Sequence, residues 1–216
     1  MQTRRGFLGA LGVTSAVSLA GCALIEDTFE ESAAPAGVPE ETLESTGFEH
    51  RTTEQLSFEQ TVTALGQSRE LRLTNWLVTY GKELEAFGPD AVRFRLFSTP
   101  SITVAGSELN PFDSFDDEEL FGEVTGSSDD DLADEGAETV ETLGDNVTYN
   151  RYATVQEIGE ESFTAYTHIG RFSNDGDLLA AIATYPEVLD ESENIYELAT
   201  AIEHPAAFER ERYQTV

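Results

Sequence analysis

Apolar and polar residues alternate through most of the chain after residue 48. In the run 69–84, leucines occupy one phase of this alternation and larger side chains the other: Leu71, Leu73 and Leu77 against Trp76, Val78 and Tyr80. Because successive side chains of an extended backbone point to opposite faces, a period of two predicts a β-strand. The run 48–64 has the same character and is separated from the next by Leu65-Gly66-Gln67-Ser68, so we expect a hairpin.

Five more runs have the character of strands. Their ranges are 92–96, 102–104, 147–158, 162–172 and 178–185. The last three are linked by short segments rich in Gly, Asn, Asp and Glu, which predicts a meander of hairpins. Residues 178–183 are apolar without interruption, which favours a central strand covered on both sides.

Two segments have helical patterns. The first is expected to begin at Asn110-Pro111, with Ser114 and Asp117 in capping-box spacing, and to end at Gly126. The acidic stretch 129–135 after it is interpreted as a solvated loop. The second helix follows Asp190 or Ser192 as N-cap, ends at Pro205, and repeats apolar residues at helical spacing: Ile195, Leu198, Ala199 and Ile202.

Strands and helices do not alternate regularly along the chain, so a parallel sheet is not expected. The pattern predicts an α+β domain, with a mainly antiparallel sheet of about six to seven strands and two helices packed on it.

The N-terminal residues carry an export signal. Arg4 and Arg5 are followed by an apolar stretch, 7–20, of 14 residues, whereas about 20 are needed to span a bilayer. Paired arginines before such a stretch are typical of twin-arginine export, and Leu19-Ala20-Gly21-Cys22 has the form of a lipobox. We therefore expect a lipid on Cys22, the only cysteine, and attachment to the extracytoplasmic face of the cell membrane.

These features predict four parts of the chain. Residues 1–21 form the signal peptide, 22–40 a lipidated acidic tether, 41–206 a single domain, and 207–216 a C-terminal tail. The tether is inferred from its prolines, its four alanines and its five carboxylates. With Cys22 lipidated, no thiol remains for a disulfide, so the domain depends on its own core for stability.

Charge restricts the solvent and the partners. The chain has 42 Asp and Glu against 12 Lys and Arg, a formal charge of -30, and loss of Arg4 and Arg5 with the signal leaves 10 cations against 42 carboxylates, or -32. Such a surface repels itself unless salt screens it, and the Debye length falls to about 3 Å at 1 M salt. We interpret the composition as halophilic, and it excludes nucleic acid, which requires a basic footprint.

Catalytic and metal motifs are absent from the sequence. There is no Gly-x-Ser-x-Gly, P-loop, Gly-x-Gly-x-x-Gly or His-Glu-x-x-His, and the three histidines lack metal-ligand spacing, so neither a cofactor nor a metal is expected. His168 is interpreted as a hydrogen-bonded sheet residue in preference to a base or ligand. His204 is expected to cap the last helix, and His50 to lie exposed on an edge strand.

Arginines within the predicted strands leave two interpretations open. They are Arg69, Arg72, Arg93, Arg95, Arg151 and Arg171. They could pair with glutamates across strands. Alternatively, Trp76, Tyr80, Arg93 and Arg95 could form one sheet face that binds an anion, an aromatic ligand or a partner. Separately, Asn146-Val147-Thr148 is a sequon, so Asn146 is a candidate for glycosylation.

The chain also resembles a known family through a series of short motifs. They are the lipobox, Glu44-Ser45-Thr46-Gly47-Phe48, Thr74-Asn75-Trp76 with Tyr80, Ser98-Thr99-Pro100, Asn110-Pro111, His168-Ile169-Gly170-Arg171-Phe172, Tyr185-Pro186 and Ile202-Glu203-His204. In this order they are similar to the haloarchaeal lipoproteins of domain-of-unknown-function family 6517. The resemblance implies an exported halophilic lipoprotein and supplies no catalytic residue. The order of elements also resembles PsbP-like α+β sandwiches, which are accessory proteins.

Two hypotheses about function follow. The favoured one is a non-catalytic binding or accessory module at the cell surface that docks a membrane protein complex or a small anion or lipid. The alternative is an extracellular hydrolase or isomerase that uses an unrecognised carboxylate with His168.

Overall fold

The computed structural model describes residues 28–64, 67–84, 88–104, 106–126, 132–158, 161–208 and 213–215. Nine strands form one sheet: β1 (Thr28–Ser32), β2 (Glu49–Ala64), β3 (Gln67–Leu84), β4 (Gly88–Pro100), β7 (Ala133–Thr142), β8 (Asp145–Ile158), β9 (Glu161–Asn174), β10 (Asp177–Pro186) and β11 (Tyr213–Thr215). A separate hairpin consists of β5 (Thr103–Val104) and β6 (Ser107–Glu108). The helices are α1 (Glu40–Thr46), α2 (Asp117–Thr125) and α3 (Ser192–Thr200), with the 3-10 turn η2 (Pro111–Asp113).

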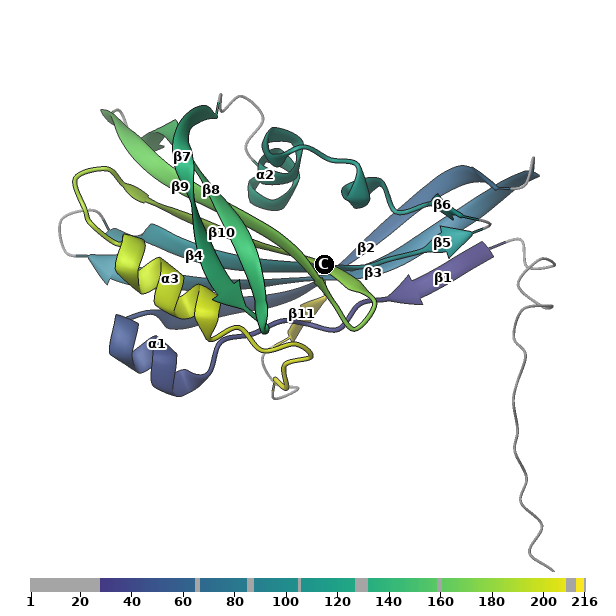
Figure 1. The fold of residues 1–216 in the computed structure, drawn as a ribbon, viewed down its shortest axis with the longest axis horizontal. Coiled ribbons are helices and arrows are strands. Elements are labelled where there is room, and N and C mark those ends of the chain that lie inside the picture. The colour runs from purple at the N-terminus through teal and green to yellow at the C-terminus, as the bar shows by residue number, and fades with distance from the viewer. Residues whose placement is uncertain are drawn as a thin grey trace, which may run out of the picture.

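The sheet is mainly antiparallel, so the predicted α+β class is confirmed (Figure 1). Its strand order is β11-β2-β3-β4-β10-β9-β8-β7. β1 pairs in parallel with residues 70–74 of β3, along the stretch that precedes the pairing of β3 with β4. β11 pairs in parallel with β2. The parallel pairings therefore come from two short strands near the ends of the chain.

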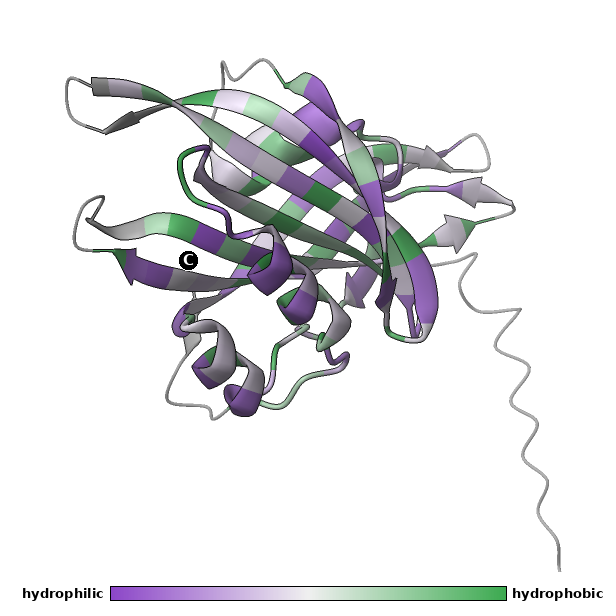
Figure 2. Cartoon of the chain, turned by 60° about the vertical axis from the view of Figure 1, so that its left-hand side comes forward, coloured by the Kyte–Doolittle hydropathy of each residue, from purple (hydrophilic) through white to green (hydrophobic). Residues whose placement is uncertain are grey.

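β10 is covered on both faces, as its uninterrupted apolar sequence predicts. Leu179, Ala181, Ala183 and Tyr185 belong to a core shared with α1 and α3. Ala180 and Ile182 belong to a second core shared with α2 and η2. Figure 1 shows α1 and α3 together on one side of the sheet and α2 on the other, and Figure 2 shows hydropathy changing from residue to residue along the strands.

The predicted start of the first helix is wrong. Asn110 accepts a hydrogen bond from the amide of Phe112 and caps η2, which ends before α2 begins. α2 has its own capping box, in which Asp116 accepts from the amide of Glu119 and Glu119 accepts from the amide of Asp116. This reciprocal pair satisfies two backbone donors, so the cap lies at Asp116. The predicted end at Gly126, in a left-handed conformation, is correct.

The acidic stretch after α2 contributes a strand that the sequence did not predict. β7 begins at Ala133, within the range interpreted as a loop, and lies at the edge of the sheet beside β8. Only Val140 and Thr142 of its ten residues are buried, so no apolar alternation marks it. Exposed charge is a common property of edge strands because it opposes pairing with another chain.

The predicted tether is largely part of the domain. From residue 28 the chain forms β1, and Ala33, Ala36 and Val38 are buried in the core. Hydrogen bonds join the amide of Ala33 to the carbonyl of Thr74 at 3.0 Å and link Gly37 to Glu203 in both directions at 2.9 and 2.8 Å. We call residues 33–38 the N-terminal segment. The predicted boundary at residue 41 is wrong because small residues and prolines, typical of linkers, also let a chain lie flat on a sheet.

α3 is joined to the sheet by the only lysine of the chain. Lys82 of β3 donates to both carboxylate oxygens of Glu191, at 2.8 and 2.9 Å, and Asn194 donates to the same carboxylate. Glu191 is the N-cap residue, where Asp190 or Ser192 was predicted. Its carboxylate is buried, so this ion pair fixes the start of α3 against β3.

Candidate functional site

The four residues predicted to form a ligand-binding face do not lie on one face. In the register of β3 and β4, Tyr80 is opposite Phe94, whereas Arg93 and Arg95 are opposite Gly81 and Thr79. Opposite residues share a face, so the arginines point away from the side that holds Tyr80. The prediction is wrong because sequence fixes the phase within each strand but not the register between strands.

Trp76 and Tyr80 bind the N-terminal segment. The indole Nε1 of Trp76 donates to the carbonyl of Ala33 at 2.9 Å, and the Tyr80 hydroxyl accepts from the amide of Val38 at 2.9 Å. Tyr80 is 1% exposed, and burial raises the pKa of its phenol to about 12. Both aromatic residues therefore use their polar atoms to satisfy backbone groups of the chain itself.

His168 lies at the centre of a buried polar cluster. Its Nε2 is 3.1 Å from the Tyr185 hydroxyl, and its Nδ1 is 3.2 Å from the Tyr196 hydroxyl. The Tyr185 hydroxyl is in turn 2.7 Å from the hydroxyl of Ser192. Since hydroxyls both donate and accept, this chain of groups satisfies a neutral imidazole completely. The cluster joins β9 and β10 to α3.

The environment of His168 holds it neutral. The side chain is 0% exposed, and burial, with a smaller contribution from the positive charge of Arg151, lowers its pKa from 6.5 to about 4. Within the described ranges, the hydrogen-bond partners of His168 are hydroxyls and none is a carboxylate. The predicted role as a hydrogen-bonded sheet residue is therefore confirmed.

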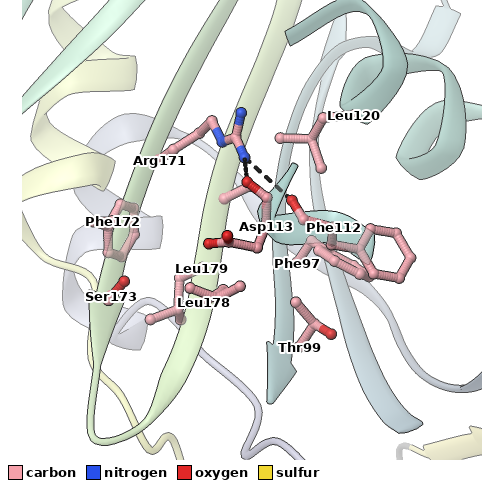
Figure 3. A pocket seen from close by; sticks show the side chains of 11 residues that line it. Phe97, Thr99, Phe112, Asp113, Leu120, Arg171, Phe172, Ser173, Leu178 and Leu179 are labelled. Carbon is pink, nitrogen blue, oxygen red and sulfur yellow. Dashed lines mark hydrogen bonds between the residues drawn. The ribbon is translucent and has the colours of Figure 1, made fainter. Parts of the chain in front are cut away.

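A cavity lies on the other side of the sheet, beneath η2 (Figure 3). Its volume is about 200 Å³. The residues that line it come from β4, β9, β10, η2 and α2, and most are apolar: Phe97, Thr99, Phe112, Asp113, Leu120, Arg171, Phe172, Ser173, Leu178, Leu179 and Ala180. The cavity therefore has mainly apolar walls. Its few hydrogen-bonding groups come from Asp113, Arg171, Ser173 and Thr99.

Arg171 holds the roof of this cavity in place. Its guanidinium donates to the carbonyls of Phe115 and Phe112, the latter at 3.2 Å, and Figure 3 shows it directed at η2. Asp117 at the start of α2 lies 4.0 Å from the guanidinium and accepts from Tyr152 at 2.7 Å. Arg171 thus binds backbone carbonyls, and the expected pairing with a glutamate is wrong for this residue. The sequence could not reveal these hydrogen bonds, because every residue has a main-chain carbonyl and the acceptors therefore need no particular side chain.

The remaining predicted residues lie apart from the cavity. Arg72 contacts Glu30, Glu59 and Glu70, which confirms the interpretation of cross-strand pairing for this arginine. Arg151 packs over the ring of Tyr166 at 4.8 Å. Asn146 is exposed in β8, and its glycosylation stays a prediction.

The other two histidines differ from their predicted roles. His204 lies beyond the end of α3 and contacts Asn174, Asp177 and the carbonyl of Ala34, so it does not cap the helix. His50 is half-buried in β2, 2.8 Å from the Thr53 hydroxyl.

Three predicted residues, Arg4, Arg5 and Cys22, lie outside the described residues. In the part of the chain that the structure describes, no helix is both long and apolar enough to cross a membrane. The same part contains no group of three histidine, cysteine or carboxylate side chains arranged to hold a metal ion.

The depressed pKa of His168 predicts a pH dependence of stability. Above pH 6.5 the imidazole is neutral in both states; as the pH falls to about 4, the unfolded chain gains a proton that the folded protein does not. The free energy of unfolding should therefore decrease over this window, by about 3 kcal/mol at most. The difference in the free energy of unfolding between the native protein and His168→Gln should shrink over the same window. The Asp and Glu carboxylates titrate in both proteins, so their contribution cancels from this difference.

Nuclear magnetic resonance of the imidazole protons in molar salt gives the direct measurement. We expect the His168 signals to titrate near pH 4. A midpoint at the ordinary value of about 6.5 would show that the imidazole reaches solvent, contrary to the buried cluster.

Comparison with known proteins gives one family. No match was found among curated proteins. A family profile matches residues 35–203, which include the N-terminal segment from Pro35, the sheet, the cavity and the His168 cluster. The match covers most of the chain, so this protein belongs to the family described as Domain of unknown function (DUF6517).

Proposed function

We propose that this protein is a lipid-anchored, extracytoplasmic binding module of a halophile, and that it docks a partner protein through the cavity beneath η2. The observation that carries the proposal is the cavity itself, with apolar walls, a polar rim and a roof held by Arg171. The proposal joins this geometry to the export and lipidation signals of residues 4–22.

The size of the cavity favours a protein partner over a cofactor or drug-sized ligand. Such ligands occupy pockets of about 300–1,000 Å³. A volume of about 200 Å³ suits a single apolar side chain. Side chains that fill such pockets often supply much of the binding energy of a protein interface. Asp113 and Ser173 at the rim can hydrogen-bond to the backbone around the inserted side chain.

The enzyme alternative receives less support from the geometry. A general base must come within hydrogen-bond reach of a substrate. His168 is closed off by Tyr185 and Tyr196, and its contacts fix α3 to the sheet. The residue that the alternative requires is therefore better suited to stability than to catalysis.

Insertion into the cavity can be tested by filling it. A benzophenone amino acid at Ser173 should crosslink one discrete partner in intact cells in molar salt. Leu178→Trp would occupy the cavity and should weaken this capture by roughly thirtyfold, equivalent to the loss of a contact worth about 2 kcal/mol.

Val188→Trp provides the control, because Val188 is 78% exposed and does not line the cavity. Capture should survive this change. Docking at the cavity would be contradicted if the benzophenone at position 173 gave no discrete adduct. It would also be contradicted if Leu178→Trp gave the same adduct in equal yield.

Lipid anchoring predicts that Cys22→Ser releases the folded protein from membranes, because a lipobox cysteine carries the acyl chains. Fractionation of cells that express the native and variant chains measures this. Arg4→Lys with Arg5→Lys is the companion variant, and it should leave unprocessed precursor inside the cell. Membrane pelleting of Cys22→Ser equal to the native protein would exclude the anchor.

Halophily predicts loss of stability when salt is removed. A formal charge of -32 after cleavage repels itself once the Debye length grows from about 3 Å at 1 M to about 10 Å at 0.1 M. The thermal midpoint of the mature lipoprotein should therefore fall as KCl is lowered between these concentrations. An unchanged midpoint would show that the acidic surface does not require brine for folding.

A further inference from the structure

The asparagine of the sequon, Asn146, differs from the other asparagines of the chain in its surroundings. The chain has six asparagines, and all of them lie among the described residues. Asn75 is buried. Four others are buried or half-buried and hydrogen-bond through their side-chain amides: Asn110, Asn150, Asn174 and Asn194. Asn146 alone is exposed, and its side chain has no hydrogen bond to the part of the chain that the structure describes. The sequon therefore falls on the one asparagine that the fold does not use.

A tight turn places this sequon at the surface. β7 and β8 are joined by a two-residue turn, in which Leu143 and Gly144 have φ angles of 52° and 85°. Positive φ at both central residues is typical of the turns that match the twist of a hairpin. Asn146 is the second residue of β8. The sequon thus begins at the tip of the hairpin and not within the sheet.

Both recognised side chains of the sequon point to solvent. Val147 and Tyr149 of β8 belong to the core that the sheet shares with α1 and α3. Because side chains alternate along a strand, Asn146 and Thr148 point to the opposite face, where both are exposed. An enzyme that modifies the sequon can therefore reach the amide and the hydroxyl from the same side.

The backbone of the sequon is also open along one edge. β7 pairs with β8 from Asp145 onward, whereas the pairing of β8 with β9 starts only at Tyr149. Among the described residues, 145–148 therefore have a neighbouring strand on one side only. This matters because the twin-arginine route, which Arg4 and Arg5 predict, carries proteins that are already folded. A sequon on such a protein must be accessible in the folded state.

We propose that Asn146 carries an N-linked glycan in the exported protein. The donor is a sugar activated as its phosphate ester. The bond that forms joins Nδ2 of Asn146 to the anomeric carbon of the sugar. The bond from this carbon to the phosphate oxygen breaks, the phosphate leaves with the electron pair, and the amide nitrogen gives up one proton. The inference rests on the export of the proposed function, because N-glycosylation acts on exported chains. It does not depend on the docking cavity.

Mass spectrometry of the protein isolated from the membranes of its own cells tests this modification. Cleavage at arginine and lysine releases residues 96–151 as one peptide, which contains the sequon. Asn146→Gln removes the acceptor and keeps an amide, and Thr148→Val removes the hydroxyl and keeps the shape of the side chain. Thr148→Ser is the matched control, because it preserves the sequon. Both positions are exposed, so all three variants should keep the thermal midpoint of the unsubstituted protein.

The proposal predicts the added mass of an oligosaccharide on this peptide in the unsubstituted protein and in Thr148→Ser, and its loss in Asn146→Gln and Thr148→Val. An unmodified peptide 96–151 from processed protein that pellets with membranes would overturn the glycan and leave the export intact. Added mass that persists in Asn146→Gln would also overturn it, because the sugar would then be attached elsewhere. An unmodified precursor that keeps residues 1–21 inside the cell would overturn the export and the glycan together.

Discussion

The hydrogen bonding of the N-terminal segment is the constraint on which the rest of this structure depends. Residues 33–38 cross the face of the sheet that carries α1 and α3, and their polar groups are satisfied by distant parts of the chain. Trp76 and Tyr80 of β3 bind the carbonyl of Ala33 and the amide of Val38. Asp177 at the start of β10 accepts from the amide of Ala34 at 2.8 Å. Because buried backbone groups must find partners, these contacts fix both where the domain begins and how the core on this face is closed.

The two faces of the sheet consequently differ in what they can do. On the α1 and α3 face, the His168 cluster and the Lys82–Glu191 pair satisfy the buried polar groups and join α3 to the strands. On the other face, η2 and α2 cover β10 incompletely and leave the cavity above Leu178 and Ala180. Arg171 stabilises the position of η2 over the cavity, because its guanidinium donates to carbonyls of η2 and leaves the cavity unfilled. On one face His168 is buried and hydrogen-bonded, whereas the other face has a cavity. This difference favours the binding module that we propose over an enzyme that uses His168 as a base.

The sequence predicted the regular parts of this fold, where a single pattern determines the result. Alternation placed β3, β8, β9 and β10, and the apolar run 178–183 identified the strand that is buried on both faces. Prediction from the sequence failed for segments whose structure depends on residues far away along the chain. β7 has the composition of a solvated loop and becomes a strand because β8 offers an edge. The N-terminal segment has the composition of a linker and becomes part of the core because Trp76 and Tyr80 bind it. The cavity was not predicted, because its roof is set by hydrogen bonds from Arg171 to main-chain carbonyls.

Hydrogen exchange of the N-terminal segment tests most directly the central claim that residues 33–38 belong to the folded unit. The amides of Ala33, Ala34, Gly37 and Val38 all donate to partners in β3, β10 or the segment after α3. In molar salt we predict that they exchange as slowly as the amides of β10, through opening of the whole domain. Exchange at the rate of an unstructured peptide would contradict the account, because residues 33–38 would then be a linker and no part of the folded unit.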